Sequence, residues 1–138
     1  MLATIPNEYR PIEDEDFMNT QQLQYFRQKL LGWQRELLRE AGETLSSLSA
    51  GGISEADMTD RASVETDRAL ELRTRDRARK LINKIDQAVE RIENGSYGYC
   101  EETGEPIGLR RLEARPIATL TIEAQERHER MERVHRDD

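Results

Sequence analysis

Apolar residues recur at alternating steps of three and four along the first part of the chain, after a lead segment, 1–18, that is acidic and contains two prolines. We expect the lead segment to be loosely ordered. Asn19 followed by Gln22 is typical of a helix start that is capped by side chains. We expect Gly51 and Gly52 to end this helix, because glycine takes the left-handed capping conformation without strain. Its predicted apolar face consists of Leu23, Phe26, Leu30, Trp33, Leu37, Ala41, Leu45 and Leu48.

A second helical pattern runs from Ala62 to Asn94 and stops at Asn94-Gly95. Its apolar face consists of Ala78, Leu81, Ile85, Ala88 and Ile92, with Leu72, Ile82 and Val89 beside it. The two patterns have similar lengths and flank one turn. Residues 19–94 are therefore predicted to form an antiparallel coiled-coil hairpin with its tip near residues 50–62.

The chain changes character beyond residue 94. Glycines and prolines between residues 95 and 118 break any helix, and we expect a compact knuckle around a small apolar set. Residues 119–138 are highly charged and lack such breakers, which predicts a C-terminal helix with a weak apolar face at Ile122, Met131 and Val134. The predicted fold class is mainly α.

Charge and composition restrict the function classes. The net charge of −7 disfavours wrapping around bare nucleic acid, because phosphate neutralisation needs a clustered basic face. We therefore expect a protein partner and no direct reading of DNA. The apolar stretches are only a few residues long and no basic-apolar leader is visible, so we expect a cytoplasmic monomer that does not insert into membranes.

Two features of the hairpin allow two interpretations each. Asp57 and Asp60 near the tip either cap the second helix or are carried by the slim hairpin into a narrow opening of a partner.

The second helix is locally basic at Arg68, Arg73, Arg75, Arg77, Arg79, Lys80 and Lys84. These side chains either form a solvated flank with intrahelical pairs, such as Glu71 with Arg75 and Asp76 with Lys80, or dock an acidic protein rim or a polyphosphate.

Cys100, Thr103, Thr121 and Ala124 have the spacing of a four-ligand zinc ribbon, which makes the knuckle zinc-finger-like. Only one of them is a cysteine. A threonine hydroxyl stays protonated near neutral pH and alanine has no donor atom, so we interpret this as a vacated zinc site. His128 and His135 could join Cys100 at a metal, but histidines on a charged helix are usually surface residues.

Other chemistry finds little support in the sequence. There is no catalytic triad, phosphate-binding glycine loop or complete metal set, so we do not expect an enzyme. Cys100 has no second cysteine to resolve an oxidised sulfur, which weakens a redox-sensor interpretation.

Three stretches resemble the DksA family, and the similarity covers nearly all of the chain beyond the lead segment. They are the tip Asp57-x-x-Asp60-Arg61-Ala62, the basic arm LELRTRDR at 70–77, and the knuckle with YGYC at 97–100 and IGLRRLEARP at 107–116. The resemblance implies a coiled coil that enters the secondary channel of bacterial RNA polymerase. With the alarmone ppGpp it would alter the lifetime of promoter complexes.

The resemblance also implies roles for single residues. Asp57, Asp60 and Ala62 match the functional tip, and Arg73 and Arg77 match arm positions that face the channel rim. Positions that help bind ppGpp are matched by Leu81, Lys84, Arg115 and Gln125. At Gln125 the family usually has a lysine, so one phosphate contact is missing. The vacated zinc positions resemble those of zinc-independent paralogues, and a structural coiled-coil adaptor without transcriptional activity is the alternative function.

Overall fold

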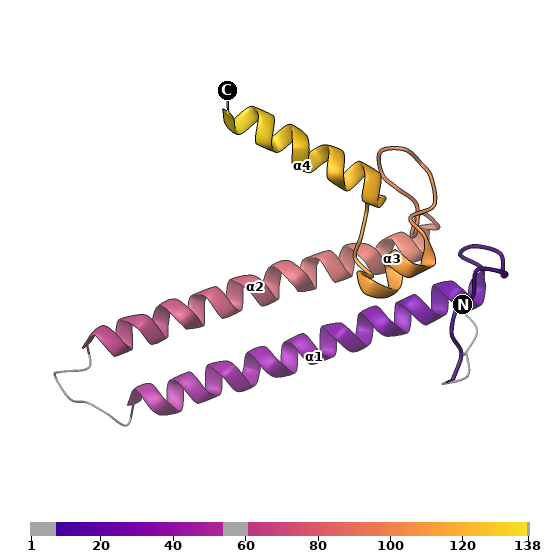
Figure 1. Cartoon of the computed structure of the whole chain (residues 1–138). Helices are drawn as coiled ribbons and strands as arrows, with labels where there is room; N and C mark the ends of the chain where they lie inside the picture. Colours follow the sequence, from indigo (N-terminus) through magenta and orange to yellow (C-terminus); the bar gives the residue numbers. More distant parts are fainter. Residues whose placement is uncertain (1–7, 54–60, 138) are drawn as a thin grey trace. The chain divides into compact units, whose positions relative to one another are not determined.

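The computed structural model describes residues 8–53 and 61–137, of which 44–53, 61–63 and 137 are described by their backbone alone. Within these residues the chain forms four helices, namely α1 (Thr20–Ile53), α2 (Arg61–Asn94), α3 (Leu109–Ala114) and α4 (Ile122–Asp137) (Figure 1). In the same residues the only β-type pairing is one bridge between Tyr99 and Pro106. The mainly α fold is confirmed, and none of the described helices is long and apolar enough to cross a membrane.

The start of α1 is specified by reciprocal side-chain caps. The backbone N–H of Gln22 donates to Asn19 Oδ1 at 2.8 Å, and the N–H of Met18 donates to Gln22 Oε1 at 2.7 Å. These bonds satisfy donors that a helix end otherwise leaves without partners, which confirms the predicted start. The predicted end is wrong, because α1 continues through both glycines to Ile53. Glycine weakens a helix by about 1 kcal/mol relative to alanine, but it keeps its N–H donor and does not force an end.

The chain divides into two compact units, which we describe separately. The arm unit comprises Leu31–Asp86, and the head unit comprises the described residues before and after it. In the arm unit α1 and α2 run antiparallel, and Gln34 Nε2 donates to Asp86 Oδ1 at 2.7 Å (Figure 1). Leu72 is 64% exposed although it was predicted beside the apolar stripe. It precedes Leu81 by nine residues, about two and a half turns, and therefore lies on the opposite side of α2.

The core of the head unit joins the ends of α1 and α2 to the knuckle. Its buried apolar residues include Phe26, Leu30, Ala88, Ile92, Tyr97, Ile107, Leu109, Leu112 and Ile117. Inside this core the Tyr97 hydroxyl donates to the Pro116 carbonyl at 2.8 Å, and the Tyr97 and Phe26 ring centroids lie 5.7 Å apart. A buried hydroxyl needs such a partner, so this bond permits the tyrosine to be fully buried.

The knuckle contains a helix that the sequence analysis did not predict. Helix α3 fits between Gly108 and Pro116, with Leu109 and Leu112 buried on one side. Glycine and proline interrupt a helix only at and near their own positions, so six residues between them can still form one short helix. Helix α4 begins at Ile122, later than predicted. Ile122, Met131 and Val134, the predicted weak apolar face, are exposed.

The described part of the lead segment packs on α1 and on the knuckle, which corrects the expectation of loose order. The N–H of Ile12 and the Tyr9 hydroxyl both donate to the Glu15 carboxylate, at 3.0 Å and 2.9 Å. The rings of Phe17 and Tyr99 meet edge to face with their centroids 5.5 Å apart. Aromatic and polar contacts of this kind order a segment that has no regular secondary structure.

Gly98→Ala tests how closely the lead segment packs on the knuckle. Gly98 has φ +93, and a Cβ atom there would lie 2.9 Å from Met18 Cγ. We expect a loss of roughly 1–3 kcal/mol in unfolding free energy from backbone strain and this clash together. Gly104→Ala is the control, since φ is +74 but nothing lies within 4 Å. Equal losses for the two variants in urea unfolding would contradict the packing explanation.

Candidate functional site

Backbone hydrogen bonds hold Cys100 at the base of a tight turn in the knuckle. Its N–H donates to the Glu105 carbonyl at 2.8 Å, and its own carbonyl accepts from the Gly104 N–H at 2.9 Å. The next residue, Glu101, donates its N–H to the Thr119 carbonyl at 2.9 Å. The turn and the segment before α4 are thereby fixed to each other beside the cysteine.

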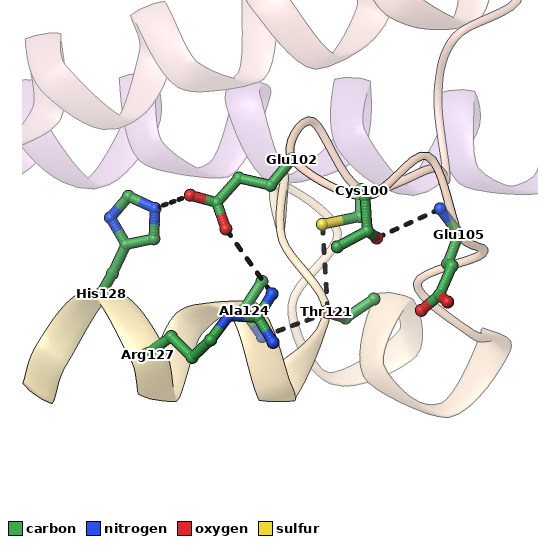
Figure 2. A network of polar contacts seen from close by, with 8 residues as sticks. Cys100, Glu102, Glu105, Thr121, Ala124, Arg127 and His128 are labelled. Atoms are coloured by element: carbon green, nitrogen blue, oxygen red, sulfur yellow. Dashed lines mark hydrogen bonds and ion pairs between the residues drawn. The ribbon is translucent and has the colours of Figure 1, made fainter.

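Hydrogen bonds link Cys100, Thr103, Thr121 and Ala124, the four positions with zinc-ribbon spacing. Thr121 Oγ1 lies 3.9 Å from Cys100 Sγ and also accepts the Ala124 N–H at 3.2 Å, which caps α4 (Figure 2). Thr103 Oγ1 accepts the Glu105 N–H at 3.2 Å and also bonds the cysteine sulfur. Cys100, Thr121 and Ala124 are buried, whereas Thr103 is exposed.

This donor set does not fit a zinc ion. One thiol, two hydroxyls and a methyl group cannot supply the four sulfur or nitrogen donors of a structural zinc site. Among the residues whose side chains are described, no three His, Cys, Asp or Glu side chains gather as a metal would require. His128 instead contacts the Glu102 carboxylate, whose other oxygen lies 3.8 Å from Arg127 Nη2 (Figure 2). His135 is exposed in the last turn of α4.

The pKa of the Cys100 thiol is set by two opposing effects. Burial raises this pKa, because a thiolate loses its hydration, but hydrogen bonds to the sulfur from the Thr103 hydroxyl and from the backbone N–H groups of Thr121, Thr103 and Glu102 lower it. The hydrogen bonds outweigh burial, and the pKa falls to about 6. The knuckle thus stabilises a thiolate with N–H and O–H donors.

The basic part of α2 contains both paired and unpaired charges. Arg75 Nη2 lies 2.7 Å from Glu71 Oε1, and Lys80 Nζ lies 3.7 Å from Asp76 Oδ2, which confirms the two predicted intrahelical pairs. Among the described residues, no carboxylate forms an ion pair with Arg73 or Arg77. Both arginines are exposed.

The arm unit also contains a groove between α1 and α2. Its volume is about 380 Å³, and it is lined by Leu37, Glu40, Ala41, Thr74, Arg77, Ala78 and Leu81. Two of the residues that the resemblance singled out, Arg77 and Leu81, therefore border one depression. Small residues at Ala41 and Ala78 leave the space unfilled.

The structure describes the predicted ppGpp-binding side chains but not those of the hairpin tip. Lys84 and Arg115 are exposed, and Gln125 is half-buried with its amide donating to Glu129 Oε1 at 3.3 Å. Asp57 and Asp60 lie outside the described residues, and Ala62 is described only as part of the α2 backbone. Both interpretations of the tip aspartates therefore stay predictions.

Sequence reasoning missed an ion pair in the head unit. Lys29 Nζ lies 2.6 Å from Glu113 Oε2, although the two residues are far apart in the chain. The Tyr25 hydroxyl also bonds to the Glu113 carboxylate. The only signal in the sequence was the four-residue spacing of Tyr25 and Lys29, which places both on one face of a helix.

The lowered pKa of Cys100 predicts a pH dependence of stability. Because the pKa is about 6 when folded and 9.0 in the reference state, the thiolate stabilises the fold fully above pH 9 and loses that contribution as pH falls through 6. The difference in unfolding free energy between wild type and Cys100→Ser should therefore shrink from pH 9 toward pH 5. Ultraviolet absorbance of the thiolate gives the pKa directly, and a midpoint above 8 would contradict this prediction.

Comparison with protein families gives two matches that together span most of the chain. The model described as "DnaK suppressor protein DksA, N-terminal domain" matches residues 22–92. The model described as "Prokaryotic dksA/traR C4-type zinc finger" matches residues 95–130. The first corresponds to most of α1 and α2, and the second to the knuckle with α3 and much of α4.

Individual relatives agree with the family matches. The RNA polymerase-binding transcription factor DksA of Caulobacter vibrioides is 71% identical over 132 residues, which cover 96% of this chain and 93% of the relative. The protein of the same name from Escherichia coli K12 is 43% identical over 115 residues, covering 83% and 76%. The solved structure of transcription factor DksA2 from Pseudomonas aeruginosa superposes with a TM-score of 0.77 at 46% identity, covering 85% of this chain and 90% of that one. The chain therefore belongs to the DksA family.

Proposed function

We propose that this protein regulates transcription by binding bacterial RNA polymerase, with the hairpin inserted in the secondary channel and its tip near the active site. The observation that carries the proposal is the antiparallel helix pair in a chain that is 71% identical to an RNA polymerase-binding transcription factor. A slim helix pair can enter an opening that a globular domain cannot enter. A coiled-coil adaptor without transcriptional activity is disfavoured by that identity, which extends over nearly the whole chain.

The exposed arginines of α2 are the proposed contacts with the channel rim. Arg73 and Arg77 are four residues apart, so they lie on one face of α2. Their guanidinium groups have no carboxylate partner among the described residues, whereas Arg75, Arg79 and Lys80 are paired within the helix. Arg73 Nε donates to the Ala69 carbonyl at 3.4 Å, but an arginine outside any ion pair can bind carboxylates of another protein without first breaking one.

We further propose that ppGpp is the effector, bound with the help of Leu81, Lys84, Arg115 and Gln125. Lys84 and Arg115 are exposed and carry the positive charge that a polyphosphate requires. Gln125 offers only a neutral amide, which is already engaged with Glu129. A hydrogen bond to a charged group contributes about 1.5–3 kcal/mol, so we expect weaker binding than in relatives with a lysine there.

The knuckle is proposed to fold without zinc. Hydrogen bonds to the Cys100 sulfur and to Thr121 Oγ1 satisfy the polar groups that replace the metal ligands. Ala118 and Ala124 are buried in the knuckle, whereas Tyr99 and Ile122 are 37% and 51% exposed. Apolar burial at about 25 cal/mol per Å² then replaces the free energy that a metal would contribute.

A regulator of this kind acts in the cytoplasm, and we propose that it does so as a monomer that does not read DNA and has no enzymatic activity. The net charge of −7 supports a protein partner over bare DNA. The basic residues proposed to contact the channel rim, Arg73 and Arg77, lie in one segment of α2.

Asp57→Asn and Asp60→Asn test the role of the tip. We expect both variants to retain affinity for core polymerase, because a helix cap contributes only about 1 kcal/mol to folding. Their effect on transcription should be lost, because it depends on carboxylates near the polymerase active site. Competition binding and an in vitro transcription assay measure the two properties. Glu65→Gln, an exposed carboxylate of α2, is the control, and full regulation by both aspartate variants would refute the proposal.

Zinc content and chelation test the metal-free knuckle. Elemental analysis of the purified protein should find no stoichiometric zinc, and a strong chelator should leave the melting temperature unchanged. The triple variant Thr103→Cys, Thr121→Cys, Ala124→Cys restores four thiols and is the positive control, since it should bind zinc and become sensitive to the chelator. Stoichiometric zinc in the wild-type protein would show that the metal-free interpretation is wrong.

A further inference from the structure

The Lys29–Glu113 pair belongs to a small network in the head unit that joins α1, α3 and the lead segment. Glu113 of α3 accepts from Lys29 Nζ at 2.6 Å and from the Tyr25 hydroxyl, both on α1. The Arg10 guanidinium of the lead segment lies over the Tyr25 ring, 5.9 Å from its centroid. The Tyr9 ring meets the Tyr25 ring edge to face with their centroids 6.2 Å apart.

Glu113 and Tyr25 of this network each keep one protonation state near neutral pH. Burial raises the pKa of Glu113, but hydrogen bonds from Lys29 and Tyr25 and the nearby charges of Lys29 and Arg10 lower it below its usual value. Burial and the Glu113 carboxylate raise the pKa of Tyr25 to about 12. Glu113 is therefore a hydrogen-bond acceptor and Tyr25 a donor throughout the physiological pH range. The contacts between α1 and α3 do not change with pH in that range.

Helix α3 needs such contacts to α1. With only six residues it is far shorter than a helix that is stable by itself in water. Leu109 and Leu112 hold it through burial, and Arg111 Nε donates to the Leu120 carbonyl at 2.9 Å. The ion pair of Glu113 adds a polar tie to α1 near the C-terminal end of the helix.

Arg115 directly follows the C-terminal end of α3, the end that Glu113 ties to α1. Its N–H donates to the Arg111 carbonyl at 2.7 Å, and its own carbonyl accepts the Ala118 N–H at 3.0 Å. The backbone of Arg115 is thus fixed to α3, while its side chain is exposed. An arginine side chain loses conformational entropy when it is ordered on a ligand, and a backbone that is already fixed adds no further ordering cost.

We infer that Glu113, held by Lys29 and Tyr25, is a positioning residue that orients Arg115 toward the polyphosphate of its ligand. The inference rests on the proposed function, in which Arg115 contacts ppGpp. It adds residues of α1 and α3 that do not themselves touch the nucleotide. Their contribution appears in the response to ppGpp and not in the affinity for polymerase alone.

Glu113→Gln and Lys29→Met test this role. We expect each to raise the ppGpp concentration for half-maximal effect in the transcription assay by roughly three- to tenfold, as for an indirect loss of one charged hydrogen bond. Affinity for core polymerase without ppGpp should not change. Lys29→Arg should restore most of the response because it keeps the charge. Glu93→Gln, an exposed carboxylate of α2, is the matched control. An equal loss of polymerase affinity without ppGpp would indicate a purely structural role and overturn the inference.

A double-mutant cycle with Arg115→Ala separates this inference from the proposed function. If Glu113 acts through Arg115, Glu113→Gln should add nothing in the Arg115→Ala background. The same loss in both backgrounds would refute the positioning role. A normal ppGpp response of Arg115→Ala would refute the proposed nucleotide contact itself, whereas a normal response of Glu113→Gln alone would refute only the positioning role.

Discussion

The buried Tyr97 side chain is the interaction on which the head unit depends. Its ring packs on Phe26 of α1, and its hydroxyl bonds to the Pro116 carbonyl at 2.8 Å. Tyr97 lies three residues after the end of α2. It therefore connects this end of α2 to α1 and to the segment after α3. Removing the acceptor would leave a hydroxyl buried without a partner, at a cost of about 1–3 kcal/mol. This contact and the apolar residues around it cross-link the two ends of the knuckle to the long helices.

Hydrogen bonds link the residues at the four positions that have zinc-ribbon spacing. Thr121 both contacts the Cys100 sulfur and caps α4, so one side chain links the turn to the last helix. N–H groups that in a zinc knuckle would bond to metal-bound sulfur here bond to a free thiolate. The hydroxyl oxygens of Thr103 and Thr121 accept other backbone N–H groups, those of Glu105 and Ala124.

Both units contain internal ion pairs as well as exposed arginines. In the arm unit, exposed arginines on one helix face are left for a partner, and this agrees with the proposed contact with a channel rim. In the head unit, charges are tied internally, as in the pair of Lys29 with Glu113 and the contacts of Glu102 with α4. Internal pairs stabilise a geometry, whereas unpaired surface charges are available for binding. In the proposed function, the arm unit would bind the channel rim of the polymerase, and the head unit would place Arg115 for ppGpp.

What the sequence determined by itself was local. The reciprocal cap of Asn19 and Gln22, the two long helices and the pairs of Glu71 with Arg75 and Asp76 with Lys80 all depend on residues within a few positions of each other. Helical periodicity therefore predicted the hairpin, and ligand spacing predicted that Cys100 and Thr121 would meet.

Only the tertiary structure decided the features that join distant segments. Helix α3, the packing of Phe17 on Tyr99, the Lys29–Glu113 pair and the lowered pKa of Cys100 all require a folded core that brings separate parts of the chain together. The glycines at 51 and 52 show the opposite case, in which a local signal for a helix end was overridden. Local propensities differ by about 1 kcal/mol per residue, and tertiary contacts of similar size reverse them.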